Sequence, residues 1–453
     1  MNIDNDTIVA RSTPPGFGAI SIIRLSGPDV LNIIERTTDI SRKKIKPKQV
    51  MRCNFVYKGT TTDEIMLTYF QKPHSYTGQH VVEISCHGSP AIVREIIDKC
   101  ILAGARHAQA GEFTKRRFLN NKIDLTQAEG INNLIHSQTS AAIRSSKKLL
   151  EGTIGKDVRS IKKQIIDNIS LLELELDFTE EEIDHTPKKR IHSNIIKLIN
   201  DVSHLINSYQ YGRLITNGLK IALIGPPNSG KSSLLNAILK EERAITSAKA
   251  GTTRDFIQES IDHQGYKLTF IDTAGIRKPV DDIENKGISK AKKVIKSCDL
   301  RLLIIDPNQP CDNYKEFVST KTMETFYVIN KIDISDRPTI DRFLNYFDIN
   351  KPILVSALQA TNIDYLNDAI IKWLESKKPT GEGDIITIQR HYNILKNTRR
   401  DLKTALKAVK RELPSEFIVT DLRHALSTLD EILGKTTNEE ILNNIFNNFC
   451  IGK

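Results

Sequence analysis

One octapeptide constrains the fold of this chain more than any other feature. Gly225-Pro226-Pro227-Asn228-Ser229-Gly230-Lys231-Ser232 fits the pattern GxxxxGK[ST] and stands between an apolar run, Ile221–Ile224, and the predicted start of a helix near Ser232. Such glycines let backbone N–H groups turn toward phosphate oxygens, and the helix N-terminus adds partial positive charge. Lys231 is then placed to reach the β- and γ-phosphates, and the Ser232 hydroxyl to bind Mg²⁺. The motif predicts a nucleoside triphosphate site, although a plain glycine-rich turn has the same composition.

Three shorter motifs follow, each directly after a predicted strand. They are Asp272-Thr273-Ala274-Gly275, Asn330-Lys331-Ile332-Asp333 and Ser356-Ala357. Asp272 is placed to hold the Mg²⁺ shell, and Gly275 to donate its N–H to the γ-phosphate. The Asp333 carboxylate can accept hydrogen bonds from N1 and N2 of guanine, a donor pair that adenine lacks. Because all four motifs stand in order at the carboxyl ends of strands, the sequence predicts GTP as the nucleotide, with Ser356-Ala357 closing over the base.

The residues that catalyse GTP hydrolysis are less evident from the sequence. The phosphate loop contains no evident arginine finger, and Ile276, directly after the second motif, cannot orient water. Asn228 and backbone carbonyls of the loop Ser247–Thr252 can instead cage a monovalent cation. Thr253 is the expected second Mg²⁺ ligand, although an ordinary turn threonine would give the same pattern. The predicted GTP-contacting set is Asn228, Ser229, Gly230, Lys231, Ser232, Ser233, Ser247, Ala248, Lys249, Ala250, Gly251, Thr252, Thr253, Asp272, Thr273, Ala274, Gly275, Asn330, Lys331, Asp333, Ser356 and Ala357.

Hydrophobic periodicity divides the 453 residues into four segments. Residues 1–120 mix short β-like runs, such as Ala19–Leu25 and Val81–Cys86, with turns, which predicts an α+β domain. Residues 121–217 carry an apolar stripe at helical spacing, from Val158 to Leu176. Residues 218–376 alternate strands with helices and predict a mostly parallel Ras-like sheet, and residues 377–453 are helical again. We therefore expect a multidomain α/β chain in which a P-loop GTPase domain is inserted into an all-helical domain.

Composition excludes several classes of protein. No run of 18 apolar residues exists, the start lacks a secretory signal, and the six cysteines form no CxxC pair, so we expect a cytoplasmic protein without a disulfide framework or a clustered zinc site. The formal charge of +10 fits a nucleic-acid partner and a lysine-rich proteome equally well. A helical stripe of basic residues can follow a phosphate backbone, but a solvated face has the same pattern. That stripe is Lys396, Arg399, Arg400, Lys403, Lys407 and Lys410, whereas Arg42–Lys46 is typical of a charged loop.

Blocks outside the GTPase motifs form a specific pattern along the whole chain. They include Thr13-Pro14-Pro15-Gly16, Arg24-Leu25-Ser26-Gly27, Ser75-Tyr76-Thr77-Gly78, Val81-Val82-Glu83, Lys122-Ile123-Asp124-Leu125-Thr126-Gln127-Ala128-Glu129, Glu180-Glu181-Glu182-Ile183-Asp184 and the terminal Cys450-Ile451-Gly452-Lys453. With these blocks and the GTPase motifs, the chain resembles the tRNA modification GTPase family MnmE (TrmE).

The resemblance implies an enzyme that hydrolyses GTP and acts with the FAD-carrying flavoprotein MnmG (GidA). Together they would add a carboxymethylaminomethyl or aminomethyl group to C5 of the wobble uridine of certain tRNAs. The one-carbon unit would come from a 5-formyl or 5,10-methylene tetrahydrofolate bound by an N-terminal domain that also forms a homodimer. By motif match, the folate contacts would be Arg24, Glu83, Lys122 and Lys453.

The resemblance also implies K⁺-stimulated hydrolysis coupled to dimerisation of the G domains. Asn228, Ser247, Lys249 and Thr252 fall on the K⁺-binding positions, and Glu284 falls on the position that orients the attacking water. Two of these positions depart from the usual pattern, Ser247 where threonine is common and Lys249 where an apolar residue is common. If both contribute backbone carbonyls, the change is harmless; if the Lys249 ammonium folds inward, it would compete with the ion. Cys450 is either a nucleophile that adds to C6 of uridine or an anchor of the tail.

The alternative function is a regulatory RNA-binding GTPase of ribosome assembly without modification chemistry.

Overall fold

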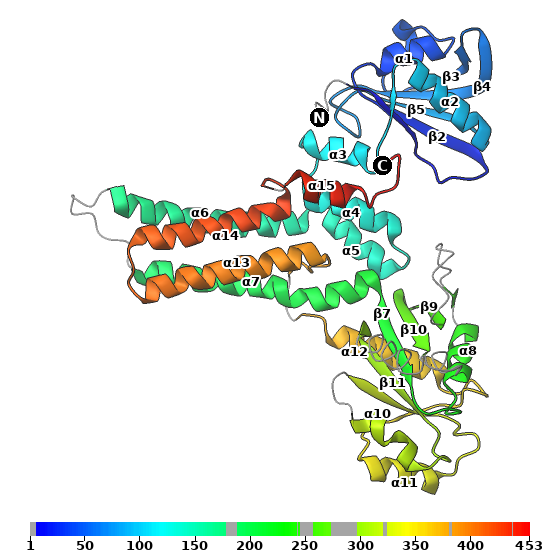
Figure 1. The fold of residues 1–453 in the computed structure, drawn as a ribbon, viewed down its shortest axis with the longest axis vertical. Helices are drawn as coiled ribbons and strands as arrows, with labels where there is room; N and C mark the ends of the chain where they lie inside the picture. The colour runs from blue at the N-terminus through cyan, green and yellow to red at the C-terminus, as the bar shows by residue number, and fades with distance from the viewer. Residues whose placement is uncertain are drawn as a thin grey trace, which may run out of the picture. The chain divides into compact units, whose positions relative to one another are not determined.

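The computed structural model describes residues 6–177, 188–241, 243–244, 257–272, 297–319, 324–379, 383–436 and 438–453. It forms two compact units, which we describe separately (Figure 1). The first unit comprises residues 1–132, 148–198 and 400–453, and the second comprises residues 133–147 and 199–399. The domain limits predicted at residues 120, 217 and 376 stay predictions. Within the described ranges, no helix is both long and apolar enough to cross a bilayer.

The first unit begins with a six-stranded sheet in the order β3-β4-β5-β2-β1-β6. Its strands are β1 (Ile8–Arg11), β2 (Gly18–Ser26), β3 (Val50–Tyr57), β4 (Thr60–Phe70), β5 (Val81–Gly88) and β6 (Arg106–His107). Neighbouring strands are antiparallel, except that β1 and β6 are parallel. Helices α1 (Val30–Thr37) and α2 (Pro90–Leu102) share one core with alternate residues of these strands, among them Ile23 and Ile84. The helices therefore cover one face of the sheet.

Helices make up the rest of the first unit. They are α3 (Glu112–Leu119), α4 (Leu125–His136), α6 (Thr153–Asp177), α14 (Ser415–Leu433) and α15 (Glu439–Phe446), with the parts of α5 (Ser140–Leu150), α7 (Lys188–Asn217) and α13 (Gln389–Lys410) that fall within its residue ranges; a short 3₁₀ turn, η1 (Arg42–Lys44), lies before β3. The predicted apolar stripe is buried at Val158, Ile161 and Ile165, which confirms it as core, while the Leu176 side chain lies outside the described ones. The pair α6–α14 is joined by Lys162 and Asp430, with Nζ 2.6 Å from Oδ2.

The second unit contains a seven-stranded sheet in the order β13-β12-β11-β7-β10-β9-β8. Its strands are β7 (Leu219–Ile224), β8 (Arg243–Ala244), β9 (Ile257–His263), β10 (Tyr266–Asp272), β11 (Leu300–Ile305), β12 (Thr325–Ile329) and β13 (Ile353–Leu354). Pairs from β13 to β10 are parallel, and β9 and β8 add an antiparallel edge. The mostly parallel sheet is confirmed.

Both faces of this sheet are covered, as a parallel sheet requires. Ile221 and Leu223 of β7 lie in a core with α8 (Lys231–Glu241) and α12 (Ile363–Ser376). Ala222 and Ile224 lie in a second core with α11 (Arg337–Phe347) and η3 (Cys311–Tyr314), which leads into α10 (Lys315–Ser319). This alternation explains why β7 reads as a continuous apolar run in the sequence, and with the first unit it confirms the predicted multidomain α/β fold class.

Candidate functional site

The phosphate loop leaves the carboxyl end of β7 in a conformation that only some residues tolerate. Gly225 and Gly230 have φ of 143° and 96°, and Asn228 has φ of 61°. A Cβ on Gly225 would lie 2.6 Å from the Ile304 carbonyl oxygen, and one on Gly230 would lie 2.1 Å from Asn330 Nδ2. Both glycines are therefore required by backbone conformation and by close approach.

Two polar side chains are buried inside the loop. Nζ of Lys231 donates to the carbonyl oxygens of Gly225 at 3.0 Å and Pro226 at 2.7 Å. Ser229 is fully buried, and among the described residues its Oγ has no hydrogen-bond partner. Since a buried hydroxyl without a partner is costly, this loop fits an anion with several acceptor oxygens. Ser233 is exposed in the first turn of α8.

Strand β10, the neighbour of β7 in the sheet, brings a carboxylate to the phosphate loop. The register of β10 against β7 pairs Asp272 with Leu223, which brings the Asp272 carboxylate beside the start of α8. The Ser232 hydroxyl donates to Asp272 Oδ2 at 2.9 Å. Mg²⁺ takes oxygen ligands at about 2.0–2.1 Å in an octahedron, whose neighbouring oxygens are about 2.9 Å apart. The hydroxyl and carboxylate therefore fit a magnesium ion.

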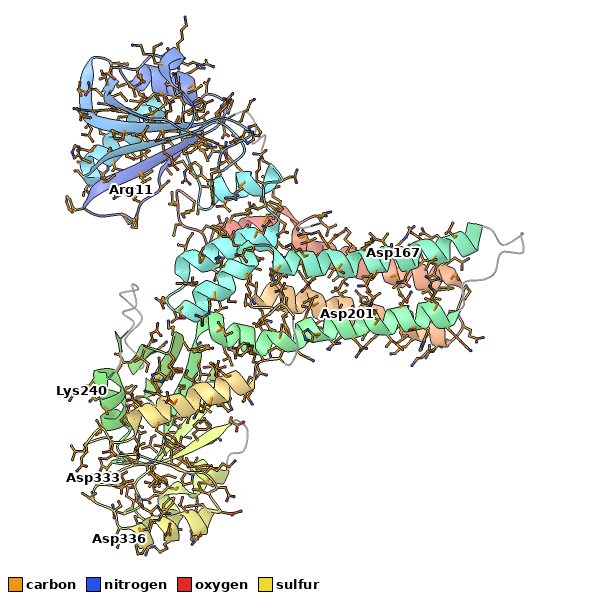
Figure 2. All side chains as sticks on the ribbon, turned by 180° about the vertical axis from the view of Figure 1, so that it is seen from behind. Arg11, Asp167, Asp201, Lys240, Asp333 and Asp336 are labelled. Atoms are coloured by element: carbon orange, nitrogen blue, oxygen red, sulfur yellow. The ribbon has the colours of Figure 1, made fainter. Side chains whose placement is uncertain are left out.

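The two motifs predicted to recognise the base meet the phosphate loop through Asn330. Its Nδ2 donates to the Ser229 carbonyl oxygen at 3.1 Å, and its Oδ1 accepts from the backbone N–H of Ala357 at 3.0 Å. Ser356 Oγ donates to Asp333 Oδ1 at 2.6 Å, which orients that carboxylate in the loop after β12 (Figure 2). With the hydrogen bond between Ser232 and Asp272, the structure thus joins described residues of all four predicted motifs at one edge of the sheet.

Asp306 belongs to this network and was not among the predicted site residues. Its buried carboxylate accepts from Lys331 Nζ at 2.7 Å, and the same ammonium donates to the Asn228 carbonyl oxygen at 3.0 Å. Asp306 thereby holds Lys331 against the phosphate loop. The signal was present in the sequence, because Asp306 directly follows the apolar run of β11, and Asp272 likewise stands at the carboxyl end of β10.

The remaining predicted residues of the nucleotide site lie outside the described residues. They are Ser247, Ala248, Lys249, Ala250, Gly251, Thr252, Thr253, Thr273, Ala274, Gly275 and Glu284. Their roles in binding GTP, Mg²⁺, K⁺ and the attacking water stay predictions.

A second polar cluster lies on the N-terminal sheet. Arg24 of β2 pairs in register with Glu83 of β5, and its Nε and Nη2 donate to Glu83 Oε1 at 2.9 and 2.7 Å. The guanidinium lies 5.0 Å from the ring centroid of Tyr76 and 5.7 Å from that of Phe113. Among the described residues, the buried Nη1 of Arg24 has no hydrogen-bond partner. This unsatisfied donor fits a ligand that brings an acceptor atom to Arg24.

Lys122 and the C-terminal tail lie near other parts of the same unit. Lys122 Cε would be 3.3 Å from a Cβ on Gly78, which stands two residues after Tyr76. The tail is bound at its backbone, because Ile451 forms a β-bridge with Ala110 and the Gly452 carbonyl accepts from Ser12 Oγ at 3.2 Å. In the described part of the chain, Lys453 forms no hydrogen bond or ion pair with Arg24 or Glu83. The structure therefore brings together two of the four predicted folate contacts.

Cys450 differs from the other cysteines of the first unit. It is exposed, whereas Cys53, Cys86 and Cys100 are buried. Burial raises the pKa of the Cys53 and Cys86 thiols to about 11 and that of Cys100 to about 12. Because the thiolate is the nucleophile, those three are poor candidates for chemistry.

Comparison with known proteins covers nearly the whole chain. Residues 7–122 match the family model "GTP-binding protein TrmE N-terminus", and residues 125–450 match "MnmE helical domain". Proteins named tRNA modification GTPase MnmE are similar from end to end. The protein from Aquifex aeolicus is 37% identical over 99% of this chain and 100% of its own length, and that from Cytophaga hutchinsonii is 36% identical over 99% and 98%.

Solved structures match part of the chain. Era from Aquifex aeolicus bound to GDP and AlF₄⁻ is 28% identical over 40% of this chain and 66% of that one, with a TM-score of 0.28.

Three relatives that match over the full length carry the same name, tRNA modification GTPase MnmE. They are the two proteins above, at 37% and 36% identity, and the protein from Clostridioides difficile, at 35%. The chain therefore belongs to the MnmE family of tRNA modification GTPases.

Proposed function

We propose that this tRNA modification GTPase acts with the FAD-carrying flavoprotein MnmG to add a carboxymethylaminomethyl or aminomethyl group to C5 of the wobble uridine of certain tRNAs in the cytoplasm. The one-carbon unit comes from a tetrahydrofolate derivative. The observation that carries the folate assignment is Arg24, which is ion-paired to Glu83 and keeps a buried donor without a partner in the described chain. Full-length relatives are tRNA modification GTPases, which disfavours the ribosome-assembly alternative.

Calorimetric titration of the full-length protein with 5-formyltetrahydrofolate tests this assignment. Arg24→Ala should weaken binding by at least about tenfold, since it removes a charged hydrogen-bond donor. Arg52→Ala is the control, because Arg52 forms a cross-strand ion pair with Glu64 in the same sheet but is exposed. If the wild-type protein binds no folate, or if the Arg24→Ala protein binds it as tightly as wild type, the assignment of a folate site at Arg24 is excluded.

GTP hydrolysis is assigned to residues of the second unit. Lys231 binds the β- and γ-phosphates, Ser232 and Thr253 bind Mg²⁺, and Glu284 orients the attacking water. Magnesium supplies neutralisation of charge on the phosphate oxygens. Glu284→Ala should therefore keep GTP affinity and lose turnover; single-turnover hydrolysis at the wild-type rate would exclude Glu284 from the mechanism.

Potassium is proposed to stand where other GTPases place an arginine. Asn228, Ser247, Lys249 and Thr252 form its site, and the support is Asn228, whose carbonyl is held by Lys331 at the mouth of the phosphate loop. Replacing K⁺ by Na⁺ at constant ionic strength should slow hydrolysis, and Lys249→Ala should leave or strengthen that dependence. Equal rates in the two salts would contradict the cation cage.

Homodimerisation is proposed through the N-terminal sheet. The registers β2–β5, β4–β5 and β3–β4 place Ile20, Met66 and Val50 on the same face as Arg24 and Glu83, opposite the helices. These apolar side chains are exposed, and the neighbouring Phe17 is 92% exposed. An apolar face beside a ligand site suits contact with a second copy. Ile20→Asp with Met66→Asp should shift sedimentation toward the monomer, whereas Leu102→Asp, an exposed position on α2, should not.

Cys450 has two possible roles in this scheme, and its backbone contacts with Gly111 and those of Ile451 with Ala110 support the anchor. Cys450→Ser separates the roles. An anchor keeps most of the tRNA modification, measured by nucleoside analysis, whereas a nucleophile loses it entirely.

A further inference from the structure

Helix α13 carries the most one-sided charge among the long helices of the described chain. Its 22 residues include seven Lys or Arg and one Asp, a formal charge of +6 against +10 for the whole protein. By contrast, α14, which follows it, has one Arg and four acidic residues. The basic excess of the composition is therefore concentrated on this helix.

The basic residues of α13 that belong to the first unit lie on one exposed face. Arg400, Lys403, Lys407 and Lys410 are all exposed, and they follow one another at steps of three, four and three residues. This spacing places them in one row about 15 Å long. Arg411, directly after the helix, is exposed as well. We call these five residues the α13 stripe.

Most charges of the stripe have no ion-pair partner among the described residues. In the described part of the chain only Arg400 has an ion pair, with the adjacent Asp401 at 3.3 Å. Elsewhere in the unit basic residues pair with acidic ones, as Arg423 does with Glu173 at 2.6 Å and Lys162 with Asp430. Four of the five stripe residues thus have no ion pair in the described part of the chain, whereas basic residues of α6 and α14 are paired.

Helix stability does not account for this arrangement. Like charges three or four residues apart, such as Lys403 with Lys407, repel and destabilise a helix. The helix dipole favours cations only in the last turn, which explains Lys407 and Lys410 but not Arg400 and Lys403. A row of cations that the fold does not require points to a ligand with repeated negative charge.

We propose that the α13 stripe binds the phosphate backbone of the RNA substrate. This inference rests on tRNA being the substrate of the proposed function. Phosphates spaced along an RNA strand match a row of lysine and arginine side chains, and each neutralised phosphate releases a counterion. The contact is independent of base sequence and therefore positions the tRNA, while the choice of nucleotide is made elsewhere.

Salt-dependent binding of a fluorescein-labelled tRNA transcript with uridine at the wobble position tests the proposal on the full-length protein. Lys403→Gln/Lys407→Gln/Lys410→Gln should weaken binding at least tenfold at 100 mM KCl. It should also reduce the slope of log K against log salt by about 2–3, since each phosphate contact contributes ~0.7–0.9. Thermal melting checks the fold, and removal of like charges should not lower the melting temperature.

Lys43→Gln/Lys44→Gln/Lys46→Gln is the matched control, because it removes the same charge from another exposed basic cluster of the same unit. It should leave affinity and slope close to wild type. Equal losses in both variants would reduce the effect to net charge and overturn the proposal, as would unchanged binding by the stripe variant. Loss of flavoprotein binding with RNA binding intact would assign the stripe to an acidic protein and overturn it too. Tetrahydrofolate-dependent modification by the wild-type protein tests the proposed function separately.

Discussion

The two sheets of this protein gather polar side chains in different ways. In the second unit, Asp272, Asp306, Asn330 and Ser356 stand at the carboxyl ends of four strands of a largely parallel sheet, so they lie at the same edge. In the first unit, Arg24 and Glu83 lie within two antiparallel strands and meet on the face of the sheet. An edge site depends only on where strands end, whereas a face site depends on register.

The difference has a physical cause in the period of two along a strand. A slip of one residue between β2 and β5 would send Arg24 to the face covered by helices, while the residue after a parallel strand stays at the edge under the same slip. Ligand binding at the edge site should therefore be sensitive to changes in the loop backbone, and ligand binding at the face site to changes in strand pairing. The following predictions test this contrast.

The largest effect is expected at the edge, for Gly230→Ala. The new Cβ would lie 2.1 Å from Asn330 Nδ2, at a φ of 96°. The loop or Asn330 must move, so GTP affinity should fall on the order of 10³-fold, about 4 kcal/mol. Gly59→Ala is the control, because its φ is 81° but nothing lies within 4 Å. It should cost only about 1–2 kcal/mol of stability and no affinity. Equal affinity losses would contradict the close-approach argument.

Asp333→Asn should change base preference rather than phosphate binding. The amide cannot accept from both N1 and N2 of guanine, so GTP affinity should fall on the order of 10²-fold and xanthosine triphosphate should bind better. Competition against a fluorescent nucleotide measures both. Asp336, three residues further on, is the N-cap of α11 and accepts a hydrogen bond from the Thr339 N–H. The control variant Asp336→Asn should therefore leave the base preference unchanged. Unaltered GTP affinity of Asp333→Asn would remove Asp333 from base recognition.

Asp306→Asn should have a smaller effect, since it acts through Lys331. Without the carboxylate the ammonium is held less firmly against the Asn228 carbonyl, so GTP dissociation should accelerate by roughly 3–10-fold, about 1 kcal/mol. Stopped-flow release of a labelled nucleotide measures the rate. Asp312→Asn, which removes an exposed ion pair with Lys315, should not change it. Equal rates in the two variants would exclude Asp306 as a positioning residue.

The smallest effect concerns the ion cluster beside the N-terminal sheet. Burial alone would raise the pKa of Glu112, but hydrogen bonds from Arg106, the Gln109 backbone and Arg116 lower it below its usual value. The stabilisation from this carboxylate is therefore present above its unfolded pKa, near 4.3, and is lost as pH falls through the lower folded value. Glu112→Gln should reduce the acid-induced fall in melting temperature. A variant with the same pH dependence as wild type would show that Glu112 does not contribute.

Most elements were predictable where their pattern is local. The predicted strand Ala19–Leu25 is β2 (Gly18–Ser26), and the predicted strand Val81–Cys86 is β5 (Val81–Gly88). The strands β3, β6, β8 and β9 were not predicted. β9 is rich in polar residues and forms an antiparallel edge, so its partner β10 rather than its own apolarity holds it in the sheet.

The sequence by itself determined the nucleotide site, because each motif carries its own strand end and needs no distant partner to be recognised. Only the tertiary structure decided that Asp306 binds Lys331 and that Arg24 pairs with Glu83 while its Nη1 stays without a partner in the described chain. It also decided that Ile20, Met66 and Val50 lie on the same face of the sheet as that ion pair. These relations join residues 16 to 59 positions apart through strand register and burial, which follow from the packing of the whole sheet rather than from any short segment.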